Sequence, residues 1–486
     1  MSLREKTVKN VAWVFVLRAG TYLLSLVTSV VLARLLFPED YGIVSLAMVF
    51  ISGGEIFGDF GLGSAIIQKQ KDDVERELYT GATLRLIFAT LIYICIFAIA
   101  PFVAYFFGVP ALVWVIRVSA IQLFLTSAGF VVNVRLTREL KFNKIVVANL
   151  SGGLSKSIFV IALAFMGLRY WSVVFGNLAG SLITVLVLYS FVSWKVKFVF
   201  DKKIGWELIH FGKYVFAVSV LTWIVFSVDK FVVGNVCGVS ILGAYQLAWT
   251  WGISVPGIVT SVLGTVLFPT YSRIAMDKEK MKRGYLEAIK YISLVSFPIG
   301  FGLMFLAPWF VRFVLAGGTT KWDTAVLPLI VLAGYGFMIS ATSPAGAIYI
   351  ACGTPKINFV QTAVCAGVIL ILVFPLTFLF GAVGTALAFF LPLPLAIWIF
   401  YNVTKLLPVT LGEVGKMMII PAASSVCAVP FCYVPLLFLS PSLFTFLCQA
   451  LLLLIAYSGF VHLFSKGELT KGFIALVKTT VRFQKQ

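Results

Sequence analysis

Charged residues are scarce in this chain of 486 residues: Asp, Glu, Lys and Arg together make up 12% of it. Soluble domains carry about 25%, and a soluble chain of this length would fold into roughly two or three domains with polar surfaces. The chain has too few polar residues to cover such surfaces, because 60% of it is hydrophobic. The composition therefore excludes an ordinary soluble protein and indicates a chain whose surface faces lipid.

Acidic residues are scarcer than basic ones, with 19 Asp and Glu against 38 Lys and Arg, for a formal net charge of +19. In a soluble protein such an excess would indicate a nucleic-acid partner. Here the basic residues lie mostly in short segments between apolar runs and not on one amphipathic face. They therefore indicate membrane topology and attraction to anionic lipid headgroups, and we expect no nucleic acid as a partner.

Metal-ligand and nucleotide-binding patterns are lacking. The two histidines, His210 and His462, stand apart, and the seven cysteines show no Cys-x-x-Cys pair or Cys/His zinc spacing, so neither a zinc site nor a disulfide framework is expected. The chain also lacks a P-loop, a Ser/His/Asp set and a long polar segment that could form a soluble domain. We therefore expect no cofactor, no metal, no enzymatic activity and no ATP-driven transport by this chain alone.

What the sequence has in abundance is long apolar runs. A helix needs about 20 mostly apolar residues to cross the hydrocarbon core, and cutting the chain at Pro, Gly and charge clusters gives about fourteen such runs. The first run is too long for a signal peptide and is predicted to be a retained span. Because the runs are too long and too apolar for barrel strands, the sequence predicts an all-α integral membrane protein. The predicted centres are Tyr22, Phe50, Ile92, Leu123, Phe159, Val185, Ile224, Val255, Pro298, Gly336, Leu370, Leu391, Ser425 and Leu453.

Lys and Arg residues are unevenly divided between the two sides of the predicted membrane. If the N-terminus is cytoplasmic, the cytoplasmic loops and both termini hold most of them, and the opposite side holds little beyond Arg169, Arg312 and Lys321. Cytoplasmic loops of membrane proteins are enriched in Lys and Arg. Both termini are therefore predicted to be cytoplasmic and the number of spans even. We expect the protein in the inner (cytoplasmic) membrane of the cell.

The chain shows signs of an internal repeat, at the turn into the second run and at the turn into the eighth. The matched pairs, all at one offset, are Gly42/Gly243, Leu46/Leu247 and Ala47/Ala248. Six spans per half would place a symmetry axis along the membrane normal, as in parallel-repeat transporters. The prediction is an N-lobe of six helices at 1–200, a C-lobe of six helices at 201–406, and two further helices with a cytoplasmic tail at 407–486.

Ionisable residues inside the apolar runs are the main candidates for a site, because each costs a few kcal/mol at the bilayer centre and usually faces a cavity or a charged partner. Arg18 and Lys156 lie deepest, in the first and fifth runs, and are predicted to face a cavity. Arg85 and Arg117 lie close enough to the ends of their runs to extend to the interface or to pair with another helix. For those two, a cavity-facing role and a structural role both stay open.

Two acidic residues of the second run, Glu55 and Asp59, are four apart and share one helix face. They could bind a coupling Na⁺ or H⁺ ion, or neutralise arginines of neighbouring runs. Asp229 and Lys230 in the seventh run could likewise take part in ion coupling or form a local pair. The sequence leaves the coupling ion open.

Most of the charged residues that lie deep in the apolar runs of the first half of the chain are basic. A cavity that exports organic cations would be expected to be acidic. A basic cavity suits an anionic group such as a pyrophosphate, to which Arg offers two parallel hydrogen bonds and Lys a point charge. The charges therefore favour a substrate with an anionic headgroup.

Three segments resemble a known family. ARLLFPEDYGIVSLAMVF at 33–50 and GDFGLGSAIIQ at 58–68 are similar to the opening signature of the polysaccharide flippases, the Wzx-type branch of the multidrug/oligosaccharidyl-lipid/polysaccharide (MOP) exporter superfamily. DKFVVGNVCGVSILGAYQLA at 229–248 resembles the second-lobe counterpart of that signature. The likeness extends over nearly the whole chain, since span count and lobe spacing also agree. These motifs separate the branch from most transporters but do not distinguish one glycan substrate from another.

The resemblance implies two six-helix lobes around a central cationic cavity, two extra C-terminal helices and alternating access. It implies a polyprenyl-pyrophosphate-linked oligosaccharide as substrate, such as an O-antigen, capsule, exopolysaccharide or teichuronic-type unit, flipped from the inner to the outer leaflet with its lipid tail staying in the bilayer. Glycan polymerases and glycosyltransferases are the expected protein partners. The candidates for headgroup binding are Arg18, Arg85, Arg117 and Lys156.

Two other functions compete with this one. A cation-coupled multidrug exporter of the same superfamily would depend on Glu55 or Asp59. A membrane-embedded glycan polymerase or ligase would need a large extracytoplasmic loop with catalytic residues, and the predicted outer loops are short and poor in charge.

Overall fold

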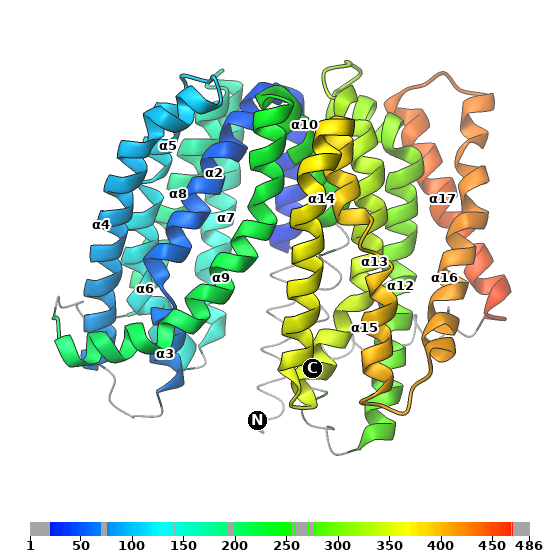
Figure 1. Ribbon diagram of the computed structural model, residues 1–486. Coiled ribbons are helices and arrows are strands. Elements are labelled where there is room, and N and C mark those ends of the chain that lie inside the picture. The colour runs from blue at the N-terminus through cyan, green and yellow to red at the C-terminus, as the bar shows by residue number, and fades with distance from the viewer. Residues whose placement is uncertain are drawn as a thin grey trace. The chain divides into compact units, whose positions relative to one another are not determined.

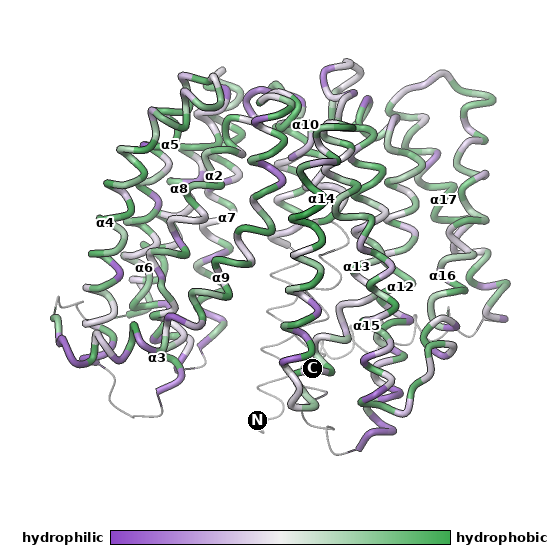
Figure 2. Tube along the Cα trace, in the orientation of Figure 1, coloured by the Kyte–Doolittle hydropathy of each residue, from purple (hydrophilic) through white to green (hydrophobic). Residues whose placement is uncertain are grey.

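The computed structural model describes residues 20–69, 75–139, 141–192, 199–254, 257, 271, 277–467 and 469 (Figure 1). Over these ranges the chain is helical and contains no strand. Eleven helical stretches within them are long and apolar enough to cross a membrane, and a shorter apolar helix lies at Gly20–Leu35. Figure 2 shows hydrophobic residues along the helices and hydrophilic residues gathered mainly at their ends. The predicted all-α membrane protein is confirmed.

The predicted spans agree with the described helices in position. Val255 lies outside the described residues, and each of the other predicted centres falls in one of the helical stretches. The centres Leu370 and Leu391 share the stretch Lys356–Thr404, which is 49 residues long. Its first helix is bent at Gly381, whose φ of 60° and ψ of −143° are not helical. This stretch is therefore more than one straight helix, as the two predicted centres require.

Residues up to Gly243 form a first compact unit. Its helices after the one at Gly20–Leu35 are α2 (Pro38–Asp59), α3 (Leu62–Gln68), α4 (Glu75–Phe106), α5 (Leu112–Ser119), α6 (Gln122–Arg138), α7 (Phe142–Phe165), α8 (Tyr170–Ser190) and α9 (Lys202–Val236). The most extensive helix contact in this unit joins α7 to α8. Small residues at that contact allow a close approach, as is common between helices in membranes.

The end of α2 is the part of the fold that positions the candidate site. The helix stops at Asp59 because Phe60 (φ 43°) and Gly61 (φ 71°) adopt left-handed backbone conformations, after which α3 begins. The ring of Phe60 stacks on Phe216 of α9, with centroids 4.4 Å apart. Further along the same two helices, the indole N–H of Trp223 donates to the carbonyl of Val49 at 3.2 Å. These two contacts with α9 thus hold the second half of α2 in place.

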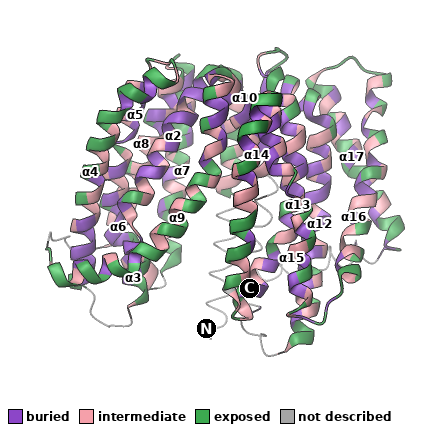
Figure 3. Cartoon of the chain, in the orientation of Figure 1, coloured by how far each residue is buried: buried purple, intermediate pink, exposed green. Residues whose placement is uncertain are grey.

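Residues from Ala244 onward form a second compact unit. Its elements are α10 (Val239–Trp249, which contains the boundary), η1 (Thr250–Ser254), α12 (Lys278–Trp309), η2 (Phe310–Leu315), η3 (Asp323–Ala325), α13 (Val326–Ala351), α14 (Pro355–Phe390), α15 (Leu395–Thr404), α16 (Leu411–Cys432), η4 (Val434–Leu437) and α17 (Leu443–Phe464). Helix α12 contacts α13, α16 and α17, and Figure 3 shows many buried residues on α12 and α13. The core of this unit therefore lies around α12.

The division at Gly243 differs from the lobe boundary predicted after residue 200. Helix α9 contacts α2, α3 and α4, so it is grouped with the first unit, and α16 and α17 are grouped with α12. The predicted lobes are defined by the sequence repeat, whereas the compact units are defined by contacts between helices. The contacts therefore do not test the repeat, and lobes at 1–200 and 201–406 stay a prediction.

Candidate functional site

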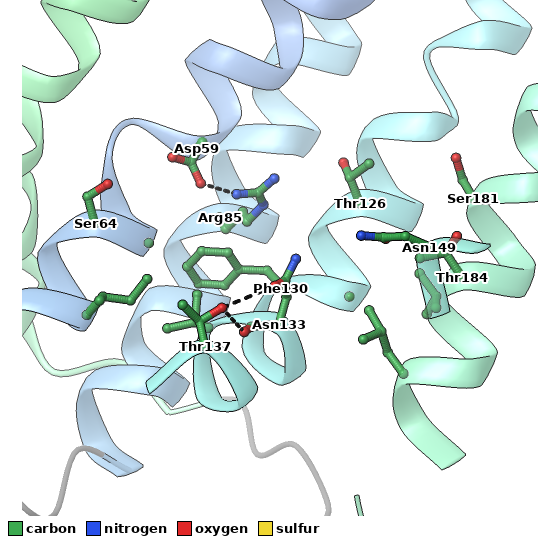
Figure 4. A pocket seen from close by; sticks show the side chains of 16 residues that line it. Asp59, Ser64, Arg85, Thr126, Phe130, Asn133, Thr137, Asn149, Ser181 and Thr184 are labelled. Carbon is green, nitrogen blue, oxygen red and sulfur yellow. Dashed lines mark hydrogen bonds and ion pairs between the residues drawn. The ribbon is translucent and has the colours of Figure 1, made fainter. Parts of the chain in front are cut away.

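A polar cavity of about 510 Å³ lies inside the first unit, between the end of α2 and helices α3, α4, α6, α7 and α8 (Figure 4). Its hydroxyl and amide side chains are Ser64, Thr126, Asn133, Thr137, Asn149, Ser181 and Thr184. Figure 4 shows those of α7 and α8 across the cavity from Asp59 and Arg85. Because hydroxyl and amide groups both donate and accept hydrogen bonds, this lining can bind a ligand that itself carries many hydroxyl groups.

One partly buried ion pair forms part of the cavity wall. Arg85 of α4 pairs with the carboxylate of Asp59 at the end of α2, and its guanidinium lies over the ring of Phe130, 4.8 Å from the centroid. The side chain of Arg85 is 12% exposed and that of Asp59 38%. Within the described part of the chain, the buried Nε of Arg85 has no hydrogen-bond partner. Arg85 can therefore donate to an anionic ligand that enters the cavity.

A second hollow of about 400 Å³ adjoins the same ion pair. It is lined by Ser52, Glu55, Ile56, Asp59, Gly61, Arg85, Phe216 and Ser219. The carboxylate of Glu55 accepts a hydrogen bond of 2.9 Å from the amide of Gln122 on α6. Asp59 and Arg85 line both hollows, so this ion pair forms part of the wall of each.

Of the three predicted headgroup residues that the structure describes, Arg85, Arg117 and Lys156, Arg85 lines these cavities. Arg18 lies outside the described residues. Arg117 folds onto α4: its Nε donates to the carbonyl of Phe97 at 3.3 Å, and its guanidinium carbon is 3.8 Å from the centroid of that ring. Lys156 is exposed near the middle of α7 and lines neither hollow. The described residues therefore do not bring the four cations together.

The predicted acidic candidates have different surroundings. Glu55 and Asp59 lie at the second hollow, next to Arg85. Asp229 is fully buried on α9, and the Nζ of Lys230 lies 3.5 Å from its carboxylate and also donates to the carbonyl of Phe226. This geometry agrees with local pairing of Asp229 and Lys230. Ion coupling by Glu55, Asp59, Asp229 or Lys230 stays a prediction.

The uncharged lining was missed in the sequence because the search there was for charges. On α6 the lining residues Thr126, Phe130, Asn133 and Thr137 are spaced four, three and four residues apart. That spacing puts them on one face of a helix. Polar residues recurring at helical spacing inside an apolar run are the signal that could have found them.

Two sequence comparisons agree on a family. The family model described as polysaccharide biosynthesis protein matches residues 31–327, more than half of the chain. The lipopolysaccharide biosynthesis protein WzxC of Escherichia coli K12 is 24% identical over 365 residues, which are 74% of this chain and 73% of that protein. The succinoglycan biosynthesis transport protein ExoT of Rhizobium meliloti is 27% identical over 333 residues, 68% of this chain and 67% of that protein. The predicted resemblance to polysaccharide flippases is confirmed at the level of the family.

A solved structure has the same fold. The inward closed conformation of lipid II flippase MurJ aligns with a TM-score of 0.78 at 18% identity, covering 93% of this chain and 99% of that one. At this identity the likeness concerns the fold. It extends over nearly the whole chain.

Proposed function

This chain belongs to the family of polysaccharide biosynthesis proteins, and we propose that it is a flippase for a polyprenyl-pyrophosphate-linked oligosaccharide. The substrate moves from the inner to the outer leaflet by alternating access, with its lipid tail in the bilayer. The observation that carries the proposal is the cavity of the first unit, which is lined by hydroxyl and amide side chains and by the guanidinium of Arg85, a side chain that is 12% exposed. An oligosaccharide pyrophosphate carries sugar hydroxyls, which suit the hydroxyl and amide side chains, and phosphate oxygens, which suit the guanidinium.

The two parts of the headgroup would use different residues. Sugar hydroxyls both donate and accept hydrogen bonds, as do the side chains of Thr126, Asn133 and Ser181. Phosphate oxygens only accept, and the guanidinium of Arg85 offers N–H groups in a planar fork. In the structure, one guanidinium nitrogen of Arg85 pairs with the carboxylate of Asp59. An entering phosphate would replace that carboxylate, so Arg85 would keep an anionic partner throughout.

Names of relatives and the composition of the chain support the same proposal. ExoT is named a transport protein and MurJ a lipid II flippase. We propose cytoplasmic termini on the basis of the Lys and Arg bias, and the inner membrane as the location. Arg18, Arg117 and Lys156 remain candidates for headgroup contacts beyond the two cavities, and enzymes that build or polymerise the glycan are the proposed partners.

Flipping of a fluorescent lipid-linked oligosaccharide in proteoliposomes tests the proposal. A hydrogen bond to a charged group is worth about 1.5–3 kcal/mol, so Arg85→Gln is expected to slow flipping by roughly 10- to 100-fold. The flipping rate of Arg85→Lys is expected to lie between those of the native protein and of Arg85→Gln. Asn133→Leu is expected to slow flipping several-fold. The matched control is Thr222→Val, since Thr222 is exposed on α9 and its hydroxyl donates to the carbonyl of Val218 within the same helix. Native rates in Arg85→Gln and Asn133→Leu would exclude this cavity as the substrate site.

One observation favours a second candidate, a cation-coupled multidrug exporter. The smaller hollow has two carboxylates, Glu55 and Asp59, for one guanidinium, and a net negative hollow suits a cation. This function predicts that cells expressing the protein resist organic cations and that Glu55→Gln abolishes the resistance. Unchanged resistance profiles would leave the flippase as the function of the chain.

A further inference from the structure

Helix α9 is longer than a membrane requires. It has 35 residues, which at 1.5 Å per residue is roughly 52 Å, whereas the hydrocarbon core is about 30 Å thick. Its first twelve residues, 202–213, contain five ionisable residues, and none follows until Asp229. The surplus length therefore belongs to the start of the helix, and the apolar part from Tyr214 onward is the part suited to the bilayer core.

The start of α9 is amphipathic and packs on the first unit by one narrow face. Gly205, Leu208 and Gly212 are buried at a spacing of three and four residues. Leu208 belongs to a core cluster with Leu62 of α3 and Leu78 of α4. In Figure 1 these first turns run crosswise at the lower ends of α4 and α3, and the later turns rise beside α2. This part of α9 thus covers one end of the unit like a short surface helix.

The opposite face of these turns is exposed, basic and aromatic. Its residues, all exposed, are Lys202, Lys203, Trp206, His210, Lys213 and Tyr214. Trp206 is 70% exposed and Tyr214 67%, which is high for side chains of that size. The Nζ of Lys213 lies 5.0 Å from the centroid of the Tyr214 ring, so charge and ring are presented together.

The acidic residue of the segment is already neutralised. The carboxylate of Glu207 accepts from the Nζ of Lys69, at the end of α3, at 3.0 Å. Lys69 also reaches Glu77 of α4 at 3.4 Å. In the described part of the chain, Lys202, Lys203 and Lys213 form no ion pair. The outward face therefore keeps its positive charge while Glu207 ties the segment to the body of the unit.

We propose that the start of α9 is a binding surface for anionic phospholipid headgroups of the cytoplasmic leaflet. Three lysines supply attraction to anionic lipid phosphates, and Trp206 and Tyr214 supply rings of the kind that settle at the membrane interface. A helix lying in the interface with Lys on its polar face and aromatic side chains beside them is the arrangement that binds anionic membranes. The side of the membrane follows from the basic loops, which place this end of the unit in the cytoplasm. The inference concerns lipid and does not rest on the proposed function.

Thermal unfolding of the full chain in mixed micelles tests the surface. Phosphatidylglycerol is expected to raise the midpoint more than phosphatidylcholine does, because a ligand that binds the folded state stabilises it. The variant K202Q/K203Q/K213Q is expected to need at least about tenfold more phosphatidylglycerol for the same shift. Salt at about 0.5 M should reduce the difference between the two lipids, and inorganic phosphate should give no shift.

Two further variants keep the test decisive. K278Q/R283Q/K416Q removes three exposed basic residues from α12 and α16 and is expected to keep the native response to phosphatidylglycerol. K202R/K203R/K213R preserves charge and is expected to behave as the native protein, which separates loss of charge from loss of folding. The proposal is overturned if both lipids stabilise the native protein equally, or if the α12/α16 variant loses the response as fully as the α9 variant.

Discussion

Gly42 of α2 and Gly243 of α10 lie directly against each other: a β-carbon built on Gly243 would be 2.9 Å from the backbone nitrogen of Gly42. The same β-carbon would meet the carbonyl of Pro38, and a β-carbon on Gly42 would meet the carbonyl of Val239. The offset that pairs Gly42 with Gly243 in the sequence also pairs Pro38 with Val239. The contact is therefore reciprocal between the two turns that the predicted repeat pairs, and both glycine positions exclude a side chain.

Alanine at either glycine is expected to destabilise the protein. The obstacle is backbone and not the end of a flexible side chain, so Gly42→Ala and Gly243→Ala should each cost about 1–3 kcal/mol, the usual range for overpacking. Thermal unfolding in detergent measures the cost. The control is Gly459→Ala on α17, where a β-carbon meets nothing within 4 Å, and its midpoint should stay or rise slightly because Ala favours helix. Equal midpoints for the three variants would contradict the close approach.

A double-mutant cycle on the cavity's ion pair should show coupling. Asp59→Asn leaves the buried Arg85 guanidinium without its anion, which is costly. Because Asp59 is partly exposed, solvent screens the pair, and the expected coupling is about 1 kcal/mol. Arg85→Gln combined with Asp59→Asn should therefore cost less than the sum of the two changes. The exposed pair of Asp277 and Lys280, 2.9 Å apart, serves as reference. A coupling in the cavity no larger than in that reference would show that burial adds nothing to the strength of the Asp59–Arg85 pair.

The contact between α7 and α8 predicts a rescue. A β-carbon on Gly176 of α8 would overlap the Cγ2 of Val160 on α7, which is 1% exposed. Gly176→Ala should therefore lower the unfolding midpoint, and adding Val160→Ala should restore part of it by removing the obstructing methyl group. In the native background Val160→Ala alone should lower the midpoint, because it leaves a cavity. The sign of the Val160→Ala effect should thus reverse between the two backgrounds, and the same sign in both would be inconsistent with this packing.

A surface cluster after α6 should make stability depend on pH. Hydrogen bonds from Lys141 and Arg135 hold the pKa of the Glu139 carboxyl below its ordinary range. A depressed pKa in the folded state contributes stability that is present above the unfolded value, near 4.3, and is lost as pH falls through the folded value. The native protein should therefore exceed Glu139→Gln in unfolding midpoint at about pH 7, and the difference should shrink towards about pH 3. A difference that is constant over that range would mean that Glu139 is not stabilised by these partners.

The positions of the helices were largely predictable, because crossing a bilayer imposes a length and an apolar composition that any single run either has or lacks. Leu123 and Leu453 were identified as centres of spans from local composition alone, and both lie in described helices. The break of α2 at Phe60 was not identified, since a left-handed residue other than glycine leaves no mark in composition. Helix α9 was predicted as a span, but its surplus first turns were not recognised as a separate surface.

The sequence by itself determined that this protein is a bundle of membrane helices of the polysaccharide biosynthesis family, because hydropathy and signature segments are properties of short stretches of chain. Only the tertiary structure decided that Arg85 meets Asp59 while Arg117 folds onto Phe97. It also decided that uncharged residues such as Asn133 and Ser181 line the cavity. The physical reason is that a side chain's partner depends on the rotation and crossing of helices, which non-local packing sets and no single run encodes.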